Sequence, residues 1–127
     1  MKDKIRILLV EDEYVTALLM QKELVRMGHE VIHHSSTGED AVGSAAQDAP
    51  DLVLMDIRLA GELDGIEAAA LIRASADIPI LFATGYDEKS VRERADQVGN
   101  IGFMLKPIDI LHLQRIVDRH FRENPPA

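Results

Sequence analysis

Short apolar runs alternate with longer polar segments along the chain, and this pattern predicts its elements. Five runs rich in Val, Ile and Leu have the length of strands. They are Ile5 to Val10, Val31 to His33, Leu52 to Met55, Ile78 to Phe82 and Ile101 to Leu105. Most of the runs are nearly continuous rather than alternating, which is typical of strands covered on both faces of a sheet. The pattern therefore predicts a buried parallel sheet.

The segments between these runs have helical features. They are Glu13 to Met27, Thr37 to Ala46, Gly65 to Ala74, Asp87 to Val98 and Asp109 to Phe121. Gly28 can stop the first helix, and Ser36 or Thr37 can cap the second. Strands and helices that alternate in this way predict a doubly wound, flavodoxin-like α/β fold with five helices on the two faces of the sheet. We expect one domain over residues 1–122 and a short tail over 123–127, whose two prolines cannot extend the last helix.

Composition narrows the class of protein. The chain has 127 residues, of which 46% are hydrophobic and 28% charged, and this suits one soluble globular domain. Because 22 acidic residues outnumber 14 basic ones, for a net charge of −8, direct binding to nucleic acid is disfavoured. The charged start and the short first apolar run predict neither a signal peptide nor a membrane span, so we expect a cytoplasmic protein with no membrane partner. The absence of cysteine excludes disulfides and thiolate metal sites.

Polar side chains stand where the predicted strands end. Glu11 and Asp12 follow the first strand, Asp56 the third, Thr84 the fourth and Lys106 the fifth. If the sheet has the order 2-1-3-4-5, the first and third strands are neighbours, and Asp12 and Asp56 meet at the switch point of the fold. Clustered carboxylates are costly unless they share a proton or bind a cation, and oxygen donors favour a hard ion such as Mg²⁺. Lys106 adds a second positive charge, so the site is suited to hold a phosphoryl group that an Asp carboxylate can accept.

Five motifs in order make the chain similar to the receiver domain of two-component response regulators, particularly those of the single-domain type. They are VEDE, LVLMDI, DGIEA, FATGY and FMLKP, and the resemblance runs from Ile5 to Phe121. It implies that Asp56 is the phosphoacceptor and that Thr84 and Lys106 bind phosphoryl oxygens. It also implies an Mg²⁺ site formed by Glu11, Asp12, Asp56 and the main-chain carbonyl of Arg58.

The same resemblance assigns further roles around the site. Thr84 and Phe103 correspond to the residues that switch position on phosphorylation, and the bond before Pro107 is expected to be cis. Arg58 and Tyr86 occupy the two positions that tune hydrolysis of the phosphoryl group. The segment from Asp56 to Gly65 is one residue longer than is common in the family, and Ala60 stands where proline is frequent.

The first predicted helix has apolar residues on two sides. At about 100° per residue, one stripe can face the sheet, and it contains Tyr14, Leu18 and Val25. A second stripe, roughly opposite, contains Ala17, Met20 and Leu24. An exposed apolar stripe usually marks a partner site, although neighbouring helices can also cover it. We expect such coverage for Ala17 and a docking surface for a helical phosphodonor at Met20 and Leu24.

The function that these features imply is a stand-alone signalling switch. A sensor histidine kinase or a histidine phosphotransfer protein would supply the phosphoryl group, as in a phosphorelay, and the signal would pass by contact to an unidentified downstream protein. The chain would catalyse only its own phosphorylation and dephosphorylation, and in that sense is not an enzyme. Alternatives are a fragment of a larger regulator or hybrid kinase, and an interaction module independent of phosphorylation. Phosphatases of the haloacid dehalogenase type also use a strand-end Asp with Mg²⁺, but carry a second Asp where this chain has Arg58.

Overall fold

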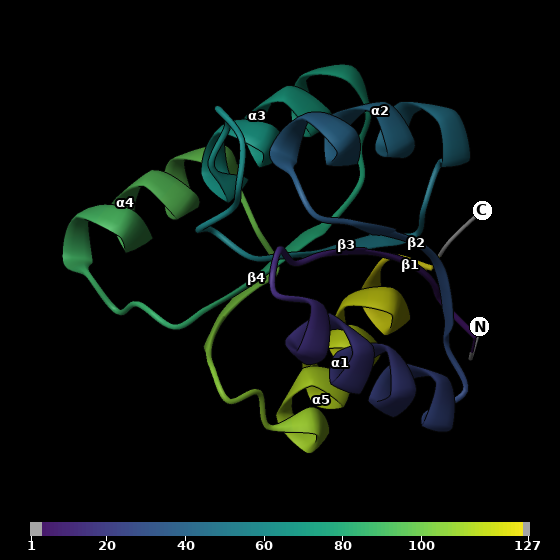
Figure 1. Ribbon diagram of the computed structural model, residues 1–127. Coiled ribbons are helices and arrows are strands. Elements are labelled where there is room, and N and C mark those ends of the chain that lie inside the picture. The colour runs from purple at the N-terminus through teal and green to yellow at the C-terminus, as the bar shows by residue number, and fades with distance from the viewer. Residues whose placement is uncertain (1–3, 126–127) are drawn as a thin grey trace.

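Five parallel strands form one sheet with helices on both of its faces (Figure 1). The structure is a computed structural model, and it describes residues 4–125. The strands are β1 (Arg6–Val10), β2 (Glu30–Ser35), β3 (Leu52–Met55), β4 (Ile80–Thr84) and β5 (Gly102–Leu105). Their order in the sheet is β2-β1-β3-β4-β5, and every neighbouring pair is parallel. The predicted fold class and strand order are confirmed.

The five helices alternate with the strands along the chain. They are α1 (Tyr14–Arg26), α2 (Gly38–Asp48), α3 (Gly65–Ser75), α4 (Lys89–Val98) and α5 (Ile110–Glu123). In Figure 1, α2, α3 and α4 lie on one side of the sheet, and α1 and α5 lie on the other. The last helix extends one residue into the predicted tail, and Pro126 and Ala127 lie outside the described residues.

Alternate residues of the central strands supply the two halves of the core. Leu8, Val53 and Phe82 pack under α2, α3 and α4, whereas Leu9 and Leu54 pack under α1 and α5. This division follows because successive strand residues point to opposite faces of a sheet. The nearly continuous apolar runs therefore reflect burial on both faces, as the sequence predicted.

Two strands end later than their apolar runs. β4 continues to Thr84 because that residue still pairs with Leu105 of β5. β2 continues to Ser35 because Ser35 still pairs with Val10 of β1. Thr84 is therefore the last residue of its strand rather than the first residue beyond it. Hydrogen bonds to the neighbouring strand determine where these strands end. The polarity of the residues in the sequence does not reveal such bonds.

The orientation expected for the first helix is wrong. Leu24 is fully buried, with an exposed fraction of 0%, and so cannot be part of an exposed docking surface. Met20 is half-buried and packs against the same core, together with the buried Ala17. Tyr14 and Val25, expected to face the sheet, are instead exposed at 72% and 56%. Both stripes recur at helical spacing, so periodicity alone did not decide which one packs on the sheet.

Candidate functional site

Three carboxylates meet at the carboxyl ends of β1 and β3. Oxygen atoms of Glu11, Asp12 and Asp56 all lie within 4.8 Å of one another, which no other group of three or more potential metal ligands does in the described part of the chain. Glu11 and Asp56 are buried, with exposed fractions of 4% and 7%, whereas Asp12 is exposed. The strand order therefore brings together the acids that the sequence assigned to one site.

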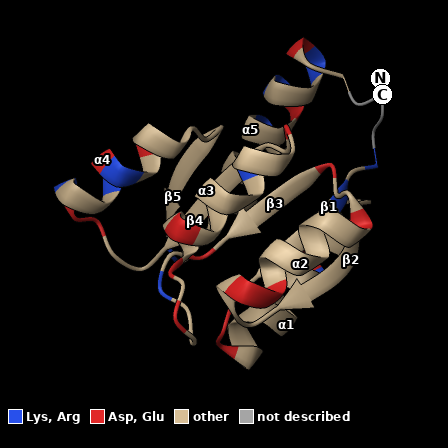
Figure 2. Ribbon diagram, turned by 90° about the horizontal axis from the view of Figure 1, so that it is seen from above, with Lys and Arg blue, Asp and Glu red and all other residues tan. Residues whose placement is uncertain are grey.

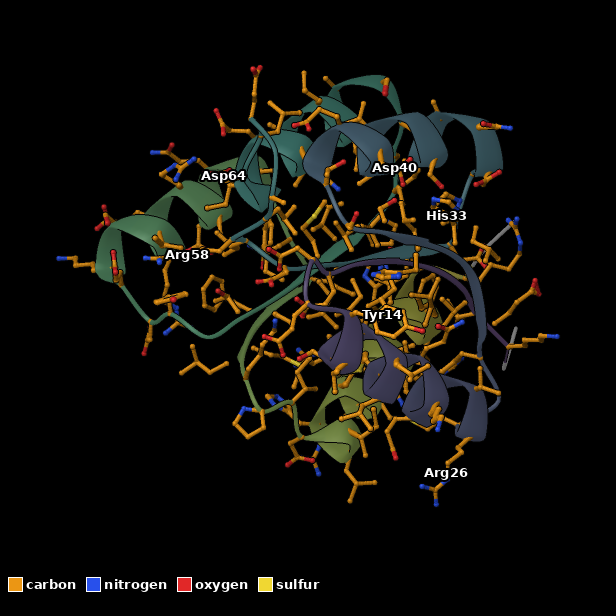
Figure 3. All side chains as sticks on the ribbon, viewed as in Figure 1. Tyr14, Arg26, His33, Asp40, Arg58 and Asp64 are labelled. Atoms are coloured by element: carbon orange, nitrogen blue, oxygen red, sulfur yellow. The ribbon has the colours of Figure 1, made fainter. Side chains whose placement is uncertain are left out.

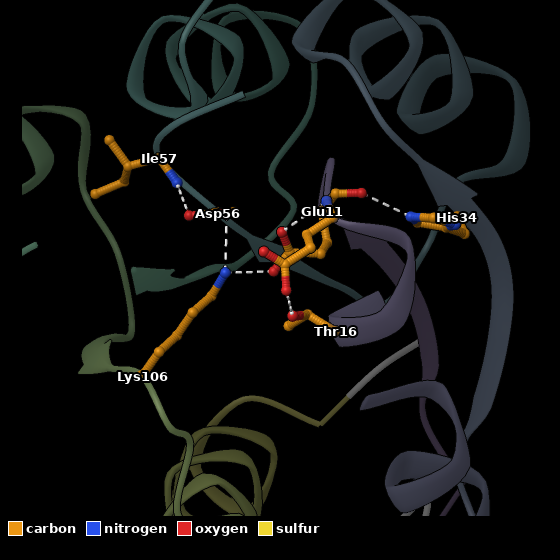
Figure 4. A network of polar contacts seen from close by, with 7 residues as sticks. Glu11, Thr16, His34, Asp56, Ile57 and Lys106 are labelled. Carbon is orange, nitrogen blue, oxygen red and sulfur yellow. Dashed lines mark hydrogen bonds and ion pairs between the residues drawn. The ribbon is translucent and has the colours of Figure 1, made fainter. Parts of the chain in front are cut away.

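Lys106 supplies the positive charge that faces these acids. Its Nζ donates to Oδ2 of Asp56 at 3.0 Å and also to Oε1 of Glu11 (Figure 4). The main-chain N–H of Lys106 donates to the carbonyl of Thr84 at 2.8 Å, which fixes the start of this side chain beside β4. The bond between Lys106 and Pro107 is cis, as the family resemblance implied. The predicted counter-charge is thus in direct contact with the predicted phosphoacceptor.

Burial shapes the electrostatics of the pair between Glu11 and Lys106. Burial raises the pKa of the Glu11 carboxyl, and the nearby Asp56 carboxylate raises it further, against the opposing hydrogen bond from Lys106. For Lys106, burial lowers the pKa, but hydrogen bonds to Glu11 and Asp56 outweigh this effect and leave the pKa above its ordinary value. The ammonium group therefore stays charged, and its charge is shared between two buried carboxylates. Because one ammonium group faces two buried carboxylates, the site favours additional positive charge.

Backbone packing holds Asp56 from the other side. Its Oδ1 accepts a hydrogen bond of 2.7 Å from the N–H of Ile57, and the Ile57 carbonyl accepts one of 2.7 Å from Gly65. A Cβ atom at Gly65 would lie only 1.9 Å from the Asp56 carbonyl oxygen. Asp64 and Glu67 form a capping box that begins α3 at this place. Gly65 was not predicted as a site residue, although the DG pair before a helix could have indicated it.

The two residues predicted to switch position lie on the β4 and β5 side of the site. Thr84 is fully buried, and its hydroxyl has no hydrogen-bond partner among residues 4–125. Phe103 is half-buried, with its ring centroid 6.4 Å from that of Phe82. The guanidinium carbon of Arg92 lies 4.8 Å from the centroid of the Phe103 ring. A buried hydroxyl without a partner is costly, so Thr84 is poised to bond a group that enters the site.

Arg58 and Tyr86, assigned separately to hydrolysis tuning, form one stacked pair. The guanidinium carbon of Arg58 lies 3.5 Å from the centroid of the Tyr86 ring. This distance is typical of a cation–π contact. Because Arg58 follows β3 and Tyr86 follows β4, the stack joins two loops beside Asp56; Figure 3 marks Arg58 at this end of the sheet.

The long loop after β3 is held by its neighbours. Ala60 forms a bridge with Thr37, and the Leu63 N–H donates to the Glu39 carboxylate at 2.7 Å. Asp64 pairs with Arg94 of α4 at 2.9 Å. Basic and acidic residues both lie along α4 (Figure 2). Arg94 is one of the basic residues, and its ion pair ties this helix to the loop. These contacts tie the loop to both α2 and α4.

A cavity of about 590 Å³ adjoins the acidic site between α1 and α5. Leu19 and Met20 of α1 line it, together with Ile108 and Ile110 near the start of α5. Lys106 lies at the boundary between this apolar cavity and the acids. Met20 therefore adjoins the site, although its partner-docking role stays a prediction.

The adjacent histidines of β2 point in different directions, as the period of a strand requires. Nε2 of His33 lies 2.9 Å from Oδ2 of Asp40, and Figure 3 shows the two together on the α2 side. The nearby Ser35 and His33 side chains lower the pKa of Asp40. Nε2 of His34 lies 2.7 Å from the main-chain carbonyl of Glu11. The two rings cannot bind one ion, and only His34 contacts the acidic site.

Comparisons with known proteins identify the class of protein. The family model described as the response regulator receiver domain matches residues 7–118. The transcriptional regulatory protein PdtaR of Mycobacterium tuberculosis strain H37Rv is 32% identical over 108 residues, which are 85% of this chain and 52% of that protein. The solved signal receiver domain of a modulated diguanylate cyclase from Desulfovibrio desulfuricans G20 is 33% identical, with a TM-score of 0.89 and coverage of 95% and 96% of the two chains. The BeF3-activated receiver domain of Klebsiella pneumoniae RstA is 27% identical, with a TM-score of 0.84 and coverage of 92% and 98%.

The chain belongs to the response regulator receiver domain family of two-component systems. It spans about half the length of PdtaR. In residues 4–125, no helix has both the length and the apolar character needed to cross a membrane. Because the chain belongs to this family, it is not a phosphatase of the haloacid dehalogenase type. Those phosphatases carry a second Asp at the position where this chain has Arg58.

Proposed function

We propose that this receiver domain takes a phosphoryl group from a phosphohistidine donor onto Asp56 and signals by protein contact in the cytoplasm. The donor would be a sensor histidine kinase or a histidine phosphotransfer protein. The observation that supports this proposal is the contact of one ammonium group, from Lys106, with the buried carboxylates of Asp56 and Glu11 at the carboxyl end of the sheet.

The acidic group fits a divalent cation such as Mg²⁺. Its donor atoms are carboxylate oxygens that come within 4.8 Å of one another, and hard cations prefer oxygen ligands. Glu11, Asp12, Asp56 and the main-chain carbonyl of Arg58 would hold the ion. When bound, it would supply positive charge opposite the phosphoryl oxygens.

In the proposed transfer, the residues of this chain orient and neutralise the reacting groups. The N–H of Ile57 holds Oδ1 of Asp56, and Oδ2, which accepts from Lys106, is the proposed attacking oxygen. A bond forms between this oxygen and phosphorus while the bond from phosphorus to the donor histidine nitrogen breaks, and the imidazole keeps the electron pair. The Lys106 ammonium and the Thr84 hydroxyl stabilise the charge on the phosphoryl oxygens.

The proposed output begins with Thr84. Its hydroxyl would turn toward the new phosphoryl oxygens, and the space it leaves would let the Phe103 ring repack. Arg92 covers that ring, so repacking of Phe103 would alter the surface of α4. The downstream partner would read this altered surface.

Dephosphorylation requires water to reach phosphorus, and the proposed obstacle is the stack of Arg58 and Tyr86. The proposed donor-docking surface is the exposed apolar face of α1. This face includes Tyr14, Val15, Leu18, Leu19 and Val25, with Met20 at its inner border. Met20→Asp is expected to slow transfer from the cognate donor, and an unchanged rate would refute docking at this border.

The central test is incorporation of radiolabelled phosphate from acetyl phosphate with Mg²⁺. The wild-type chain should become labelled, and Asp56→Asn should abolish the label because an amide is a poor nucleophile. Persistent labelling of Asp56→Asn would refute the assignment. A Mg²⁺-dependent change of the amide NMR spectrum on addition of beryllofluoride should accompany phosphorylation competence, and its absence would favour a phosphorylation-independent module.

A further inference from the structure

The Glu11 residue is bonded through every polar atom it has. Its N–H donates to the Ser35 carbonyl at 2.9 Å, and its carboxylate accepts from Lys106 and from the N–H of Glu13, the latter at 3.1 Å. The remaining acceptor is its main-chain carbonyl, which lies 2.7 Å from Nε2 of His34 (Figure 4). Ser35 and Glu13 make their contacts through the main chain, so Lys106 and His34 are the two described residues that bond to Glu11 through a side chain, and His34 has no role in the proposed transfer.

We propose that His34 is a positioning residue of the cation site. A carbonyl oxygen only accepts hydrogen bonds, so Nε2 of His34 carries the hydrogen and donates it. The carbonyl of Glu11 and the N–H of Asp12 belong to the same planar peptide unit. The hydrogen bond from the His34 ring therefore fixes the orientation of the peptide unit that precedes the Cα atom of Asp12. That orientation directs the Asp12 carboxylate toward Glu11 and Asp56.

Asp12 depends on such support more than the other two acids. Glu11 and Asp56 are buried and bonded to Lys106, whereas the Asp12 side chain is exposed. The surrounding protein therefore restrains Asp12 less through packing, and the orientation of its backbone carries more of its position. His34 can supply that restraint because it extends from β2, which pairs with β1 directly before the acidic loop.

The neighbouring histidine provides a matched control. His33 lies next to His34 on the same strand, but its Nε2 contacts Asp40 on the α2 side rather than the acidic loop. Substitution of either histidine by Phe removes one ring donor from β2 and keeps an aromatic ring. Only the change at His34 removes a bond to the Glu11 carbonyl.

The experiment measures the affinity for Mg²⁺ alone by isothermal titration calorimetry. His34→Phe should weaken Mg²⁺ binding by about tenfold, the lower end of the effect of partners that orient metal ligands. His34→Gln, whose amide N–H reaches a similar position, should restore most of the affinity. His33→Phe should bind Mg²⁺ as the wild type does. Unfolding by urea in the presence of a chelator separates any general loss of stability from the loss of cation affinity.

The inference is overturned by unchanged Mg²⁺ affinity in His34→Phe, or by an equal loss in His33→Phe. Nitrogen NMR of the wild-type histidines gives a test that does not depend on a folded variant. It should find hydrogen on Nε2 of His34, and an unprotonated Nε2 would overturn the inference. The inference rests on the proposed cation site, so a wild type that does not bind Mg²⁺ would overturn both. Binding by the wild type with unchanged affinity in His34→Phe would overturn the role of His34 alone.

Discussion

The two halves of the site differ in how completely the protein bonds their polar groups. The bonded half consists of Glu11, Asp56 and Lys106, with the exposed Asp12 at its edge. The open half consists of Arg58, Thr84, Tyr86 and Phe103. Hydrogen bonds and two ion pairs hold Glu11, Asp56 and Lys106 in place. By contrast, the Thr84 hydroxyl has no partner among residues 4–125, and Phe103 is only half-buried.

This difference suits the separate tasks proposed for the two halves. Charges that stabilise a transferring group act best when they are already in place and need no rearrangement. A residue that reports the transfer needs a second position to occupy, and a group without a bond in the first position loses least by moving. Changes in the bonded half should therefore affect transfer, and changes in the open half should affect the response or its duration.

The largest effect is expected from Lys106→Met in the bonded half. The substitution keeps a similar length but removes the charge on the phosphoryl oxygens, so phosphorylation by acetyl phosphate should slow by about 10²-fold or more. Lys89→Met is the matched control, because Lys89 is an exposed lysine of α4 whose contact is with Glu93. Label incorporation over time measures both rates. Equal rates in the two variants would show that charge in the bonded half does not drive transfer.

Gly65→Ala tests whether backbone packing keeps the bonded half rigid. The new methyl group would lie 1.9 Å from the Asp56 carbonyl oxygen, so the Asp56 backbone or α3 must shift. We expect destabilisation by about 1–3 kcal/mol, typical of overpacking, together with slower phosphorylation. The free energy of unfolding in urea measures the first effect.

A second glycine provides the control for this change. Gly43 lies within α2, and a Cβ there meets no atom within 4 Å. Gly43→Ala should therefore stabilise the chain by about 0.5–1 kcal/mol through helix propensity, without altering phosphorylation. Gly65→Ala with wild-type stability and rate would contradict the tight packing against Asp56.

Thr84→Val tests the open half. Because the Thr84 hydroxyl is buried without a partner among the described residues, its replacement by a methyl group should leave stability unchanged or raise it by about 1 kcal/mol. The response of the Phe103 ring to beryllofluoride, followed by NMR, should be lost. Thr37→Val should instead cost about 1 kcal/mol, because the Thr37 hydroxyl caps α2 by accepting from the Asp40 N–H at 3.1 Å. Equal stability losses in the two variants would mean that Thr84 is bonded after all.

The sequence predicts the bonded half better than the open half for a physical reason. Continuous apolar runs indicate buried strands, and parallel strands end at one edge, so the order of residues along the chain is enough to bring Asp12, Asp56 and Lys106 together. The direction of a helix face is a weaker signal, because either apolar stripe of α1 satisfies helical spacing. Leu24 was misplaced for this reason. The contact of His34 with Glu11 joins two residues that are 23 positions apart with α1 between them, so it leaves no local pattern in the sequence.

The smallest effect is expected from the stack of Arg58 and Tyr86, where the open half meets solvent. Arg58→Ala and Tyr86→Ala should each shorten the lifetime of the aspartyl phosphate, because either change removes the same stack. A cation–π contact at an exposed site contributes about 0.5–1 kcal/mol, which corresponds to a factor of about 2–5 in the rate of hydrolysis. The double variant should lose phosphate little faster than either single variant, since the stack can be removed only once. Loss of label from purified phosphoprotein measures all three rates. If the double variant instead hydrolyses at a rate raised by the product of the two single effects, Arg58 and Tyr86 obstruct water independently. The open half would then contain two separate barriers to water.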